Sequence, residues 1–188
     1  MTTGAPQGPT LQVLDLRLTD LRQLFNSMDP APFRERDLDL EAEDYIVSWA
    51  RELPAGSRLS LEVHLAREPA TADEAKLINE AVHEHFSRSA QVSRRRLRQL
   101  FRTGRVSLVI GIAFLGAAIA LAQSLGKAID NEGYAWMVKE SLIIGGWVAL
   151  WRPMEIFLYE WWPIRADIKL FDRLAAMPVS LRAAERGA

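Results

Sequence analysis

Residues 106–122, "VSLVIGIAFLGAAIALA", form a stretch of 17 residues without a charged side chain. As an α-helix rising about 1.5 Å per residue it is roughly 25 Å long, slightly short of a ~30 Å hydrocarbon core. Seven arginines and no acid occupy residues 88–105, as the positive-inside rule expects before a membrane span. The alternative is a buried core helix of a soluble protein. We predict a first transmembrane helix over residues 106–123.

The ends of the second apolar segment are less clear from the sequence. Residues 141–151, "SLIIGGWVALW", number only 11 and cannot span a bilayer alone. Extended upstream, the span covers residues 135–152, and Arg152 lies at the cytoplasmic boundary. Extended downstream to Trp162, it buries Arg152 in the bilayer. The upstream span is the prediction, and the longer one stays open.

Three ionisable residues near this segment are candidate functional positions in the membrane. They are Arg152, Glu155 and Glu140. A charge at the bilayer centre costs on the order of 3 kcal/mol on insertion scales, so such residues are retained mainly for function. Pro153 lacks an N–H and breaks helices, which is cheaper at a membrane exit than in lipid. It therefore favours exit near Arg152.

The two spans predict a hairpin with both termini in the cytoplasm. A short loop over residues 124–134 joins them on the external side, and basic residues follow the second span. We expect a multi-pass protein of the inner (cell) membrane whose basic collar contacts anionic lipids rather than nucleic acid. The collar comprises Arg94, Arg95, Arg96, Arg98, Arg102 and Arg105.

The acidic N-terminal part predicts a small cytosolic α/β head over residues 11–70. Residues 11–18 and 58–67 alternate apolar and polar side chains, as half-buried strands do. A short helix follows Thr19, and Asp39 can cap a second one. A third helix opens at residue 71 and continues as a stalk to the first span. The fold class is thus an α+β membrane protein with a β-α-α-β-α head.

The predicted head is incomplete, because a lone strand pair is marginal in water. Its two strands favour a parallel right-handed crossover and leave open edges. We therefore expect homo-oligomers, or docking of a soluble cytosolic partner or a larger membrane complex. Outside the head, we predict a disordered leader (1–10), an interfacial amphipathic helix (153–177) and a flexible tail (178–188).

Candidate chemistry is sparse. The chain has no cysteine, and His83 and His85 lie two apart on a helix, so they cannot share one metal ion and are expected to be solvated. We predict no metal, no cofactor and no catalytic residue. The best binding candidate in the head is a charged loop, which contains Arg34, Arg36, Asp37 and Asp39.

These features predict a membrane scaffold or regulatory protein that self-associates and docks partners through its head. One alternative is an oligomeric channel or transport subunit, in which Arg152 and Glu155 line a polar path. A weaker alternative is an enzyme with its site in the loop from Arg34 to Asp39.

Overall fold

The computed structural model describes residues 11–19, 23–25, 37–54, 56–65, 72–128 and 132–183. Its chain divides into two compact units. The α/β unit comprises Met1–Val92 and Ala166–Ala188, and the helical unit comprises Ser93–Arg165. Three predicted features lie outside the described residues: the leader, the end of the tail after residue 183, and most of the short helix after Thr19.

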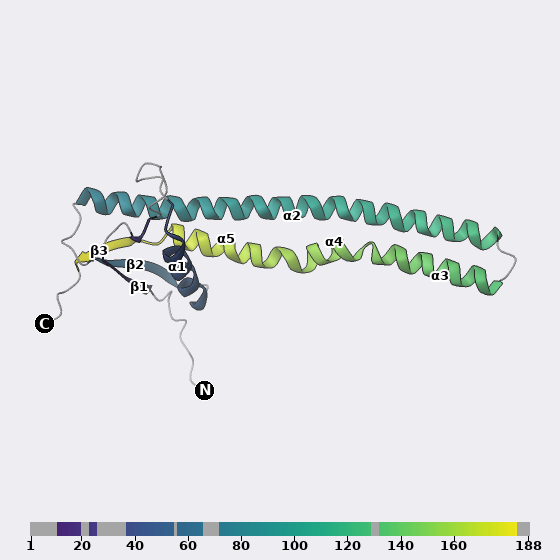
Figure 1. The fold of residues 1–188 in the computed structure, drawn as a ribbon, viewed down its shortest axis with the longest axis horizontal. Helices are drawn as coiled ribbons and strands as arrows, with labels where there is room; N and C mark the ends of the chain where they lie inside the picture. Colours follow the sequence, from purple (N-terminus) through teal and green to yellow (C-terminus); the bar gives the residue numbers. More distant parts are fainter. Residues whose placement is uncertain are drawn as a thin grey trace, which may run out of the picture. The chain divides into compact units, whose positions relative to one another are not determined.

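Three parallel strands form the sheet of the α/β unit, in the order β1-β2-β3 (Figure 1). They are β1 (Leu11–Leu18), β2 (Arg58–Leu65) and β3 (Val179–Ala183), and Val63 of β2 lies opposite Leu181 of β3. The first two strands and their parallel pairing are confirmed predictions. The third strand is not predicted by the sequence, and it makes β2 the central strand.

Strand β3 corrects the prediction of a flexible tail over residues 178–188. The side chain of Asn79 accepts a hydrogen bond of 3.2 Å from the Val179 N–H. His83 Nε2 lies 2.8 Å from the Met177 carbonyl oxygen, to which it donates. These bonds hold the chain entering β3 against helix α2. Both join residues more than 90 positions apart in the sequence, so no local pattern could reveal them.

Helix α1 (Leu40–Glu52) connects β1 to β2. As predicted, Asp39 is its N-cap, because its Oδ1 accepts a 3.0 Å hydrogen bond from the Glu41 N–H. Its buried face consists of Ile46, Val47 and Ala50. Tyr45, which directly precedes this face in the sequence, is exposed.

Helix α5 (Trp161–Ala175) enters the α/β unit at Ala166 and carries part of its core. Leu170, Leu174 and Met177 are buried in the same cluster as the strands. This corrects the predicted interfacial helix over residues 153–177, whose second half packs on protein instead of lipid. An apolar stripe at helical spacing does not specify which apolar surface covers it.

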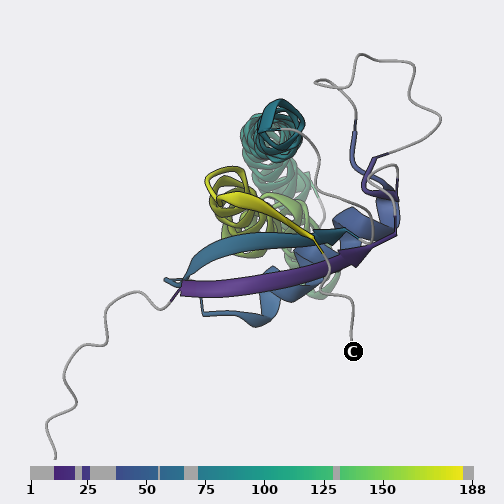
Figure 2. The ribbon, with the colours of Figure 1, turned by 90° about the vertical axis from the view of Figure 1, so that its left-hand side faces the viewer.

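Among the residues that the structure describes, only one face of the sheet is covered. Leu59, Leu61, Val63 and Leu65 of β2 point into the core and are all buried. The alternate side chains of β1 and β2 are exposed or half-buried, among them Val13 at 40%. Figure 2 looks onto the strands, with α1 behind them. Parallel sheets are normally covered on both faces, so this second face is unusual.

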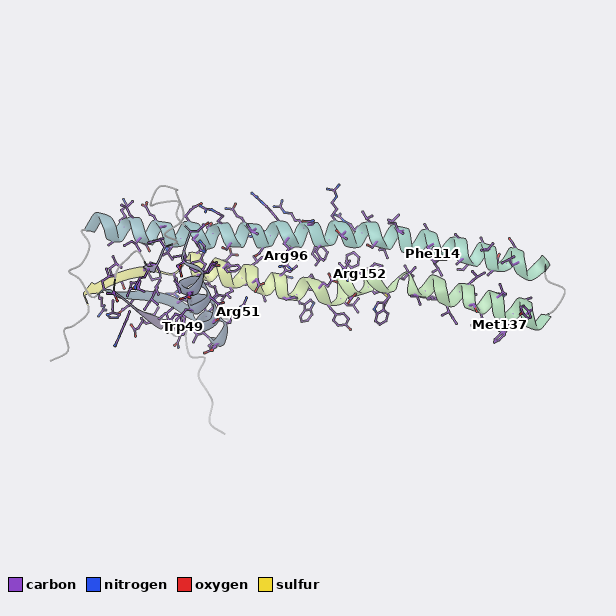
Figure 3. All side chains as sticks on the ribbon, in the orientation of Figure 1. Trp49, Arg51, Arg96, Phe114, Met137 and Arg152 are labelled. Atoms are coloured by element: carbon purple, nitrogen blue, oxygen red, sulfur yellow. The ribbon has the colours of Figure 1, made fainter. Side chains whose placement is uncertain are left out.

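Two helical segments that run through the helical unit are long and apolar enough to cross a membrane, Ala75–Leu125 and Gly133–Ala175. The first lies in helix α2 (Ala72–Ala128), which has no break in 57 residues. Large apolar side chains on both segments are exposed, including Phe114 and Met137 (Figure 3). The structure thus bears out two candidate spans.

The second segment is broken near the predicted boundary. Helix α3 (Glu132–Val148) ends before Ala149, and α4 (Trp151–Glu155) follows. Pro153 offers no N–H to the carbonyl of Ala149, which is its i−4 partner in a continuous helix. The irregular turn at residues 149–150 is the result.

Glycines bring α2 and α3–α4 into close contact. A methyl group on Gly146 would lie 2.6 Å from Leu115 Cδ1, and one on Gly111 would lie 3.1 Å from the Ala149 carbonyl oxygen. Gly111 therefore makes room for the carbonyl that Pro153 leaves unbonded. Methyl groups on Gly116 and Gly145 would meet nothing within 4 Å. These two glycines, although small, are not part of the contact.

Candidate functional site

A cluster of three charges lies in the second apolar segment. Arg152 Nη1 donates a 3.0 Å hydrogen bond to Glu155 Oε2 and a second bond to Glu160 Oε1. All three side chains retain solvent exposure, from 59% for Arg152 to 30% for Glu160. One guanidinium is thus shared by two carboxylates, which leaves the cluster with a net charge of −1.

A π-helical turn, η2 (Ile156–Glu160), explains how the sequence builds this cluster. In a regular α-helix, residues eight apart are rotated by about 80° around the axis. The wider π turn changes that rotation and brings Glu160 toward Arg152. Trp161 Nε1 donates a 2.9 Å hydrogen bond to the Phe157 carbonyl and ties the irregular turn together.

The structure brings together two of the three predicted membrane residues, Arg152 and Glu155. Glu140 is exposed on α3 and has no ion pair within the part of the chain that the structure describes. Glu160 joins the cluster instead. The sequence places Glu160 on the polar side of a regular amphipathic helix. Only the irregular π turn brings it beside Arg152, and an analysis of helical periodicity assumes a regular helix.

The charged loop of the head is tied into the fold. Asp37 Oδ1 pairs with Arg88 Nη1 at 2.9 Å, and Asp39 caps α1. Arg34 and Arg36 lie outside the described residues. Both described carboxylates of this predicted binding site, Asp37 and Asp39, therefore already have partners within the protein. Fewer groups of the loop remain to bind a ligand.

His85 corrects the prediction of solvated helix histidines, since it is only 8% exposed. Its Nδ1 accepts a 3.3 Å hydrogen bond from the Leu38 N–H, so the neutral ring carries its proton on Nε2. That nitrogen lies 3.3 Å from Glu43 Oε2. His83 is likewise engaged, with the Met177 carbonyl. Both rings fasten distant segments to α2.

The open face of the sheet carries a row of charged groups across three strands. His64 Nε2 lies 3.2 Å from Asp15 Oδ1, and Arg182 binds both oxygens of Glu62 at 3.0 and 3.1 Å. Asp15, Glu62 and His64 offer potential ligand atoms within 4.8 Å of one another. Arg182 occupies both oxygens of Glu62, so a cation would have to displace it. The row fits an ion-pair network better than a metal site.

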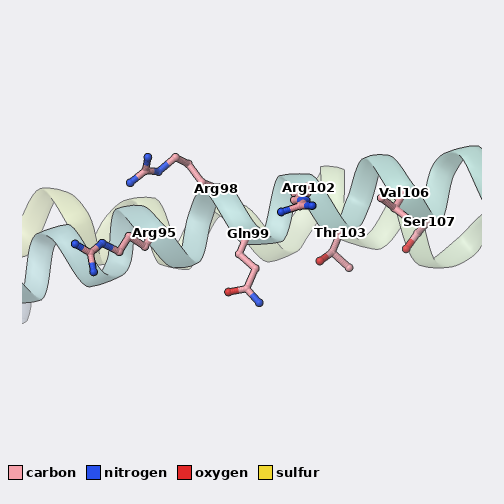
Figure 4. Close-up of a pocket in the computed structure, with 7 residues that line it drawn as sticks. All are labelled: Arg95, Arg98, Gln99, Arg102, Thr103, Val106 and Ser107. Atoms are coloured by element: carbon pink, nitrogen blue, oxygen red, sulfur yellow. The ribbon is translucent and has the colours of Figure 1, made fainter.

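The basic collar is exposed along α2, and all six predicted arginines lie on the surface. Three of them line a shallow hollow that faces away from the rest of the helical unit (Figure 4). Its lining residues are Arg95, Arg98, Gln99, Arg102, Thr103, Val106 and Ser107.

In comparisons with known proteins, no family model, no curated protein and no solved structure matches this chain.

Proposed function

We propose that the chain is an integral membrane protein whose helical unit crosses the membrane twice and whose α/β unit is a cytoplasmic self-association and docking module. The membrane part is supported by exposed apolar side chains that would be costly in water. On α2 they include Val106, Val109, Ile110, Ile112, Phe114 and Leu121, all more than half exposed.

The composition of the α/β unit supports the proposal of two crossings. Val92 and Ala166 belong to the same unit, with one sheet and one core. The chain between them must therefore leave and return on the same side of any membrane. With two candidate spans in that stretch, this supports a hairpin with an even number of crossings.

The orientation is supported by charge. The exposed arginines of α2 end at Arg105, directly before Val106, where the continuous apolar stretch of α2 begins. The positive-inside rule places this side, and with it the α/β unit, in the cytoplasm. Exposed Trp136 and Trp151 mark the two ends of a second span between them, as interfacial aromatic residues do.

The observation that carries the docking function is the uncovered side of the parallel sheet. Among the described residues, β1 pairs only with β2, so its outer edge has backbone groups ready for another strand. The open face beside this edge displays Leu11 at 60% and Val13 at 40% exposure. Natural proteins rarely leave such an edge and face together without a partner.

The occupant that suits this edge is β1 of a second copy. In an antiparallel pair centred on Leu16, Asp15 lies opposite Arg17 of the other copy, and Arg17 opposite Asp15. Opposite charges that face each other across strands stabilise a pair. The same register places Leu14 against Leu18 on the core side. The strand is thus complementary to itself.

A disulfide test suits a chain without cysteines. In this register a Leu16→Cys variant places the two sulfur-bearing residues directly opposite, about 5 Å apart, which suits a disulfide. In Leu18→Cys, the matched control, the two positions are roughly 13 Å apart and cannot bond. We expect mild oxidation of native membranes to dimerise only the first variant. Equal dimerisation of both, or of neither, would contradict the proposal.

A second candidate function, an oligomeric channel or transport subunit, is favoured by the charged cluster in the second segment. Ionisable residues in a span commonly mark a transport path, and π turns are frequent at functional sites. Liposomes containing the protein should then conduct ions, and Arg152→Ala should abolish the flux while Arg105→Ala should not. Absence of flux under every imposed gradient would remove this candidate.

A further inference from the structure

We infer that the hollow on α2 is a binding site for the phosphate group of an anionic phospholipid. This inference rests on the proposed membrane location of the helical unit. The proposed site is one face of α2 with defined residues, and it is distinct from the basic collar as a whole.

The residues of the hollow form one continuous face. Arg95, Arg98 and Arg102 follow one another at intervals of three and four residues, which places them on the same side of a helix. Gln99 and Thr103, which also line the hollow, add an amide and a hydroxyl. Side chains of this set supply many N–H and O–H donors, and guanidinium groups match phosphate oxygens in geometry.

The charge on this face is not balanced by protein. Elsewhere, Arg88 pairs with Asp37, and Arg182 with Glu62. Within the described residues, the side chains of Arg95, Arg98 and Arg102 have no ion pair, and no carboxylate lines the hollow. Three unpaired guanidinium groups on one face are a site for an anion with several oxygens.

The hollow also lies at the right depth. It extends to Val106 and Ser107, where the exposed surface of α2 becomes apolar. Arg102 precedes Val106 by four residues, or about 6 Å along the axis, and Arg98 by about 12 Å. The polar headgroup layer of a bilayer is roughly 5–8 Å thick on each side. Arg102 and Thr103 therefore lie at headgroup depth, and the flexible side chain of Arg98 reaches it.

The opposite face of the helix serves another purpose. A methyl group on Gly104 would lie 2.9 Å from Ile156 Cγ2, and Phe101 stacks on Phe157 with ring centroids 6.1 Å apart. The packing face of α2 is thus turned to η2. The hollow faces outward, where lipid would be.

The test compares two variants of identical composition in the full-length protein. R98Q/R102Q removes two arginines that line the hollow, and R96Q/R105Q removes two exposed arginines of the same stretch that do not line it. Binding of fluorescent phosphatidylglycerol to each protein in mixed micelles is the readout, with phosphatidylcholine as the zwitterionic reference. We expect R98Q/R102Q to weaken phosphatidylglycerol binding by at least about tenfold and R96Q/R105Q by no more than about threefold.

Equal losses in the two variants would overturn the site and leave a general collar. Two further probes separate the sources of the anion. Competition by inorganic phosphate as strong as that by phosphatidylglycerol would indicate a soluble ligand, and tighter binding of a single-stranded oligonucleotide would indicate nucleic acid. Either result would overturn the lipid assignment.

A failure of this inference can be told from a failure of the proposed function. Wild type and both variants are reconstituted into phosphatidylcholine liposomes, washed with carbonate and floated. A wild-type protein that does not float contradicts the membrane location itself. Proteins that all float, with equal lipid affinities, contradict only the site.

Discussion

Replacing Gly111 and Gly146 by alanine should destabilise the helical unit, whereas the same replacement at Gly116 and Gly145 should not. At Gly146 the added methyl group would lie 2.6 Å from Leu115 Cδ1. At Gly111 it would lie 3.1 Å from a backbone carbonyl oxygen, which a rotamer change cannot move. At the two control positions it meets nothing within 4 Å.

The expected magnitude follows from these contacts. Overpacking by one methyl group typically costs about 1–3 kcal/mol, so the two sites together give about 2–6 kcal/mol if they act independently. Alanine also stabilises a helix by about 1 kcal/mol over glycine. This gain is common to both double variants, G111A/G146A and G116A/G145A, which have the same composition. Even the lower bound changes the unfolding equilibrium roughly 30-fold.

Denaturation with dodecyl sulfate from mild detergent micelles measures this difference. Five of the six tryptophans lie in residues 136–162, so their fluorescence reports chiefly on the second helical segment. We expect G111A/G146A to unfold at a lower dodecyl sulfate fraction than G116A/G145A. Coinciding midpoints for the two double variants would refute the close contact at these glycines.

Three further substitutions test the α/β unit, each by its free energy of unfolding or by hydrogen exchange. Asn79→Ala removes the acceptor of the Val179 N–H. It should lower the free energy of unfolding by about 1–3 kcal/mol and speed amide exchange in β3. Unchanged exchange there would contradict the role of Asn79. Arg173→Ala removes hydrogen bonds of 3.1–3.2 Å to the Pro54 and Ser57 carbonyls. It should lower the free energy of unfolding by about 1.5–3 kcal/mol. A loss no larger than that of the control Arg58→Ala would contradict a structural role for these bonds. Asp39→Ala should cost about 1 kcal/mol by loss of the α1 cap, with Asp39→Asn near wild type; equal losses would exclude capping as the cause.

Much of the architecture is predictable because it is written in local patterns. The alternation in β1 and β2, the cap at Asp39 and the uncharged run after Arg105 each occupy fewer than 20 consecutive residues. Such patterns identify strands, helices and candidate spans without knowledge of the rest of the chain. The break before Pro153 belongs to the same class, since one residue type causes it.

Features that depend on distant partners are not predictable in this way. β3 is five residues long, and its alternation of Val179 and Leu181 with polar residues is too short to stand out. Its neighbour Val63 is 118 positions away. His85 is buried because Leu38 and Asp37 cover it from 47 and 48 positions upstream. The sequence shows these residues but not which surfaces meet.

The candidate sites divide along the same line. Arg152 and Glu155 are three apart on one helix, so their pairing follows from spacing. Glu160 requires the π turn, whose position no residue pattern marks. For the hollow on α2, the sequence already shows the arginines. Only the structure shows that they have no ion pairs among the described residues.

The α/β unit is divided between the two ends of the chain, so its folding depends on the helical unit that connects them. β1, α1 and β2 are synthesised first, but Leu170, Leu174 and Met177, which complete the core, follow the helical unit. A two-stranded sheet is marginal by itself, so the unit gains its full core only when α5 and β3 have been synthesised and have packed on β2. Without them, Leu61 and Val63 would be partly uncovered and open to aggregation. Under the proposed membrane location, a folded α/β unit would therefore report a correctly inserted helical unit, which is a property suited to the proposed docking module.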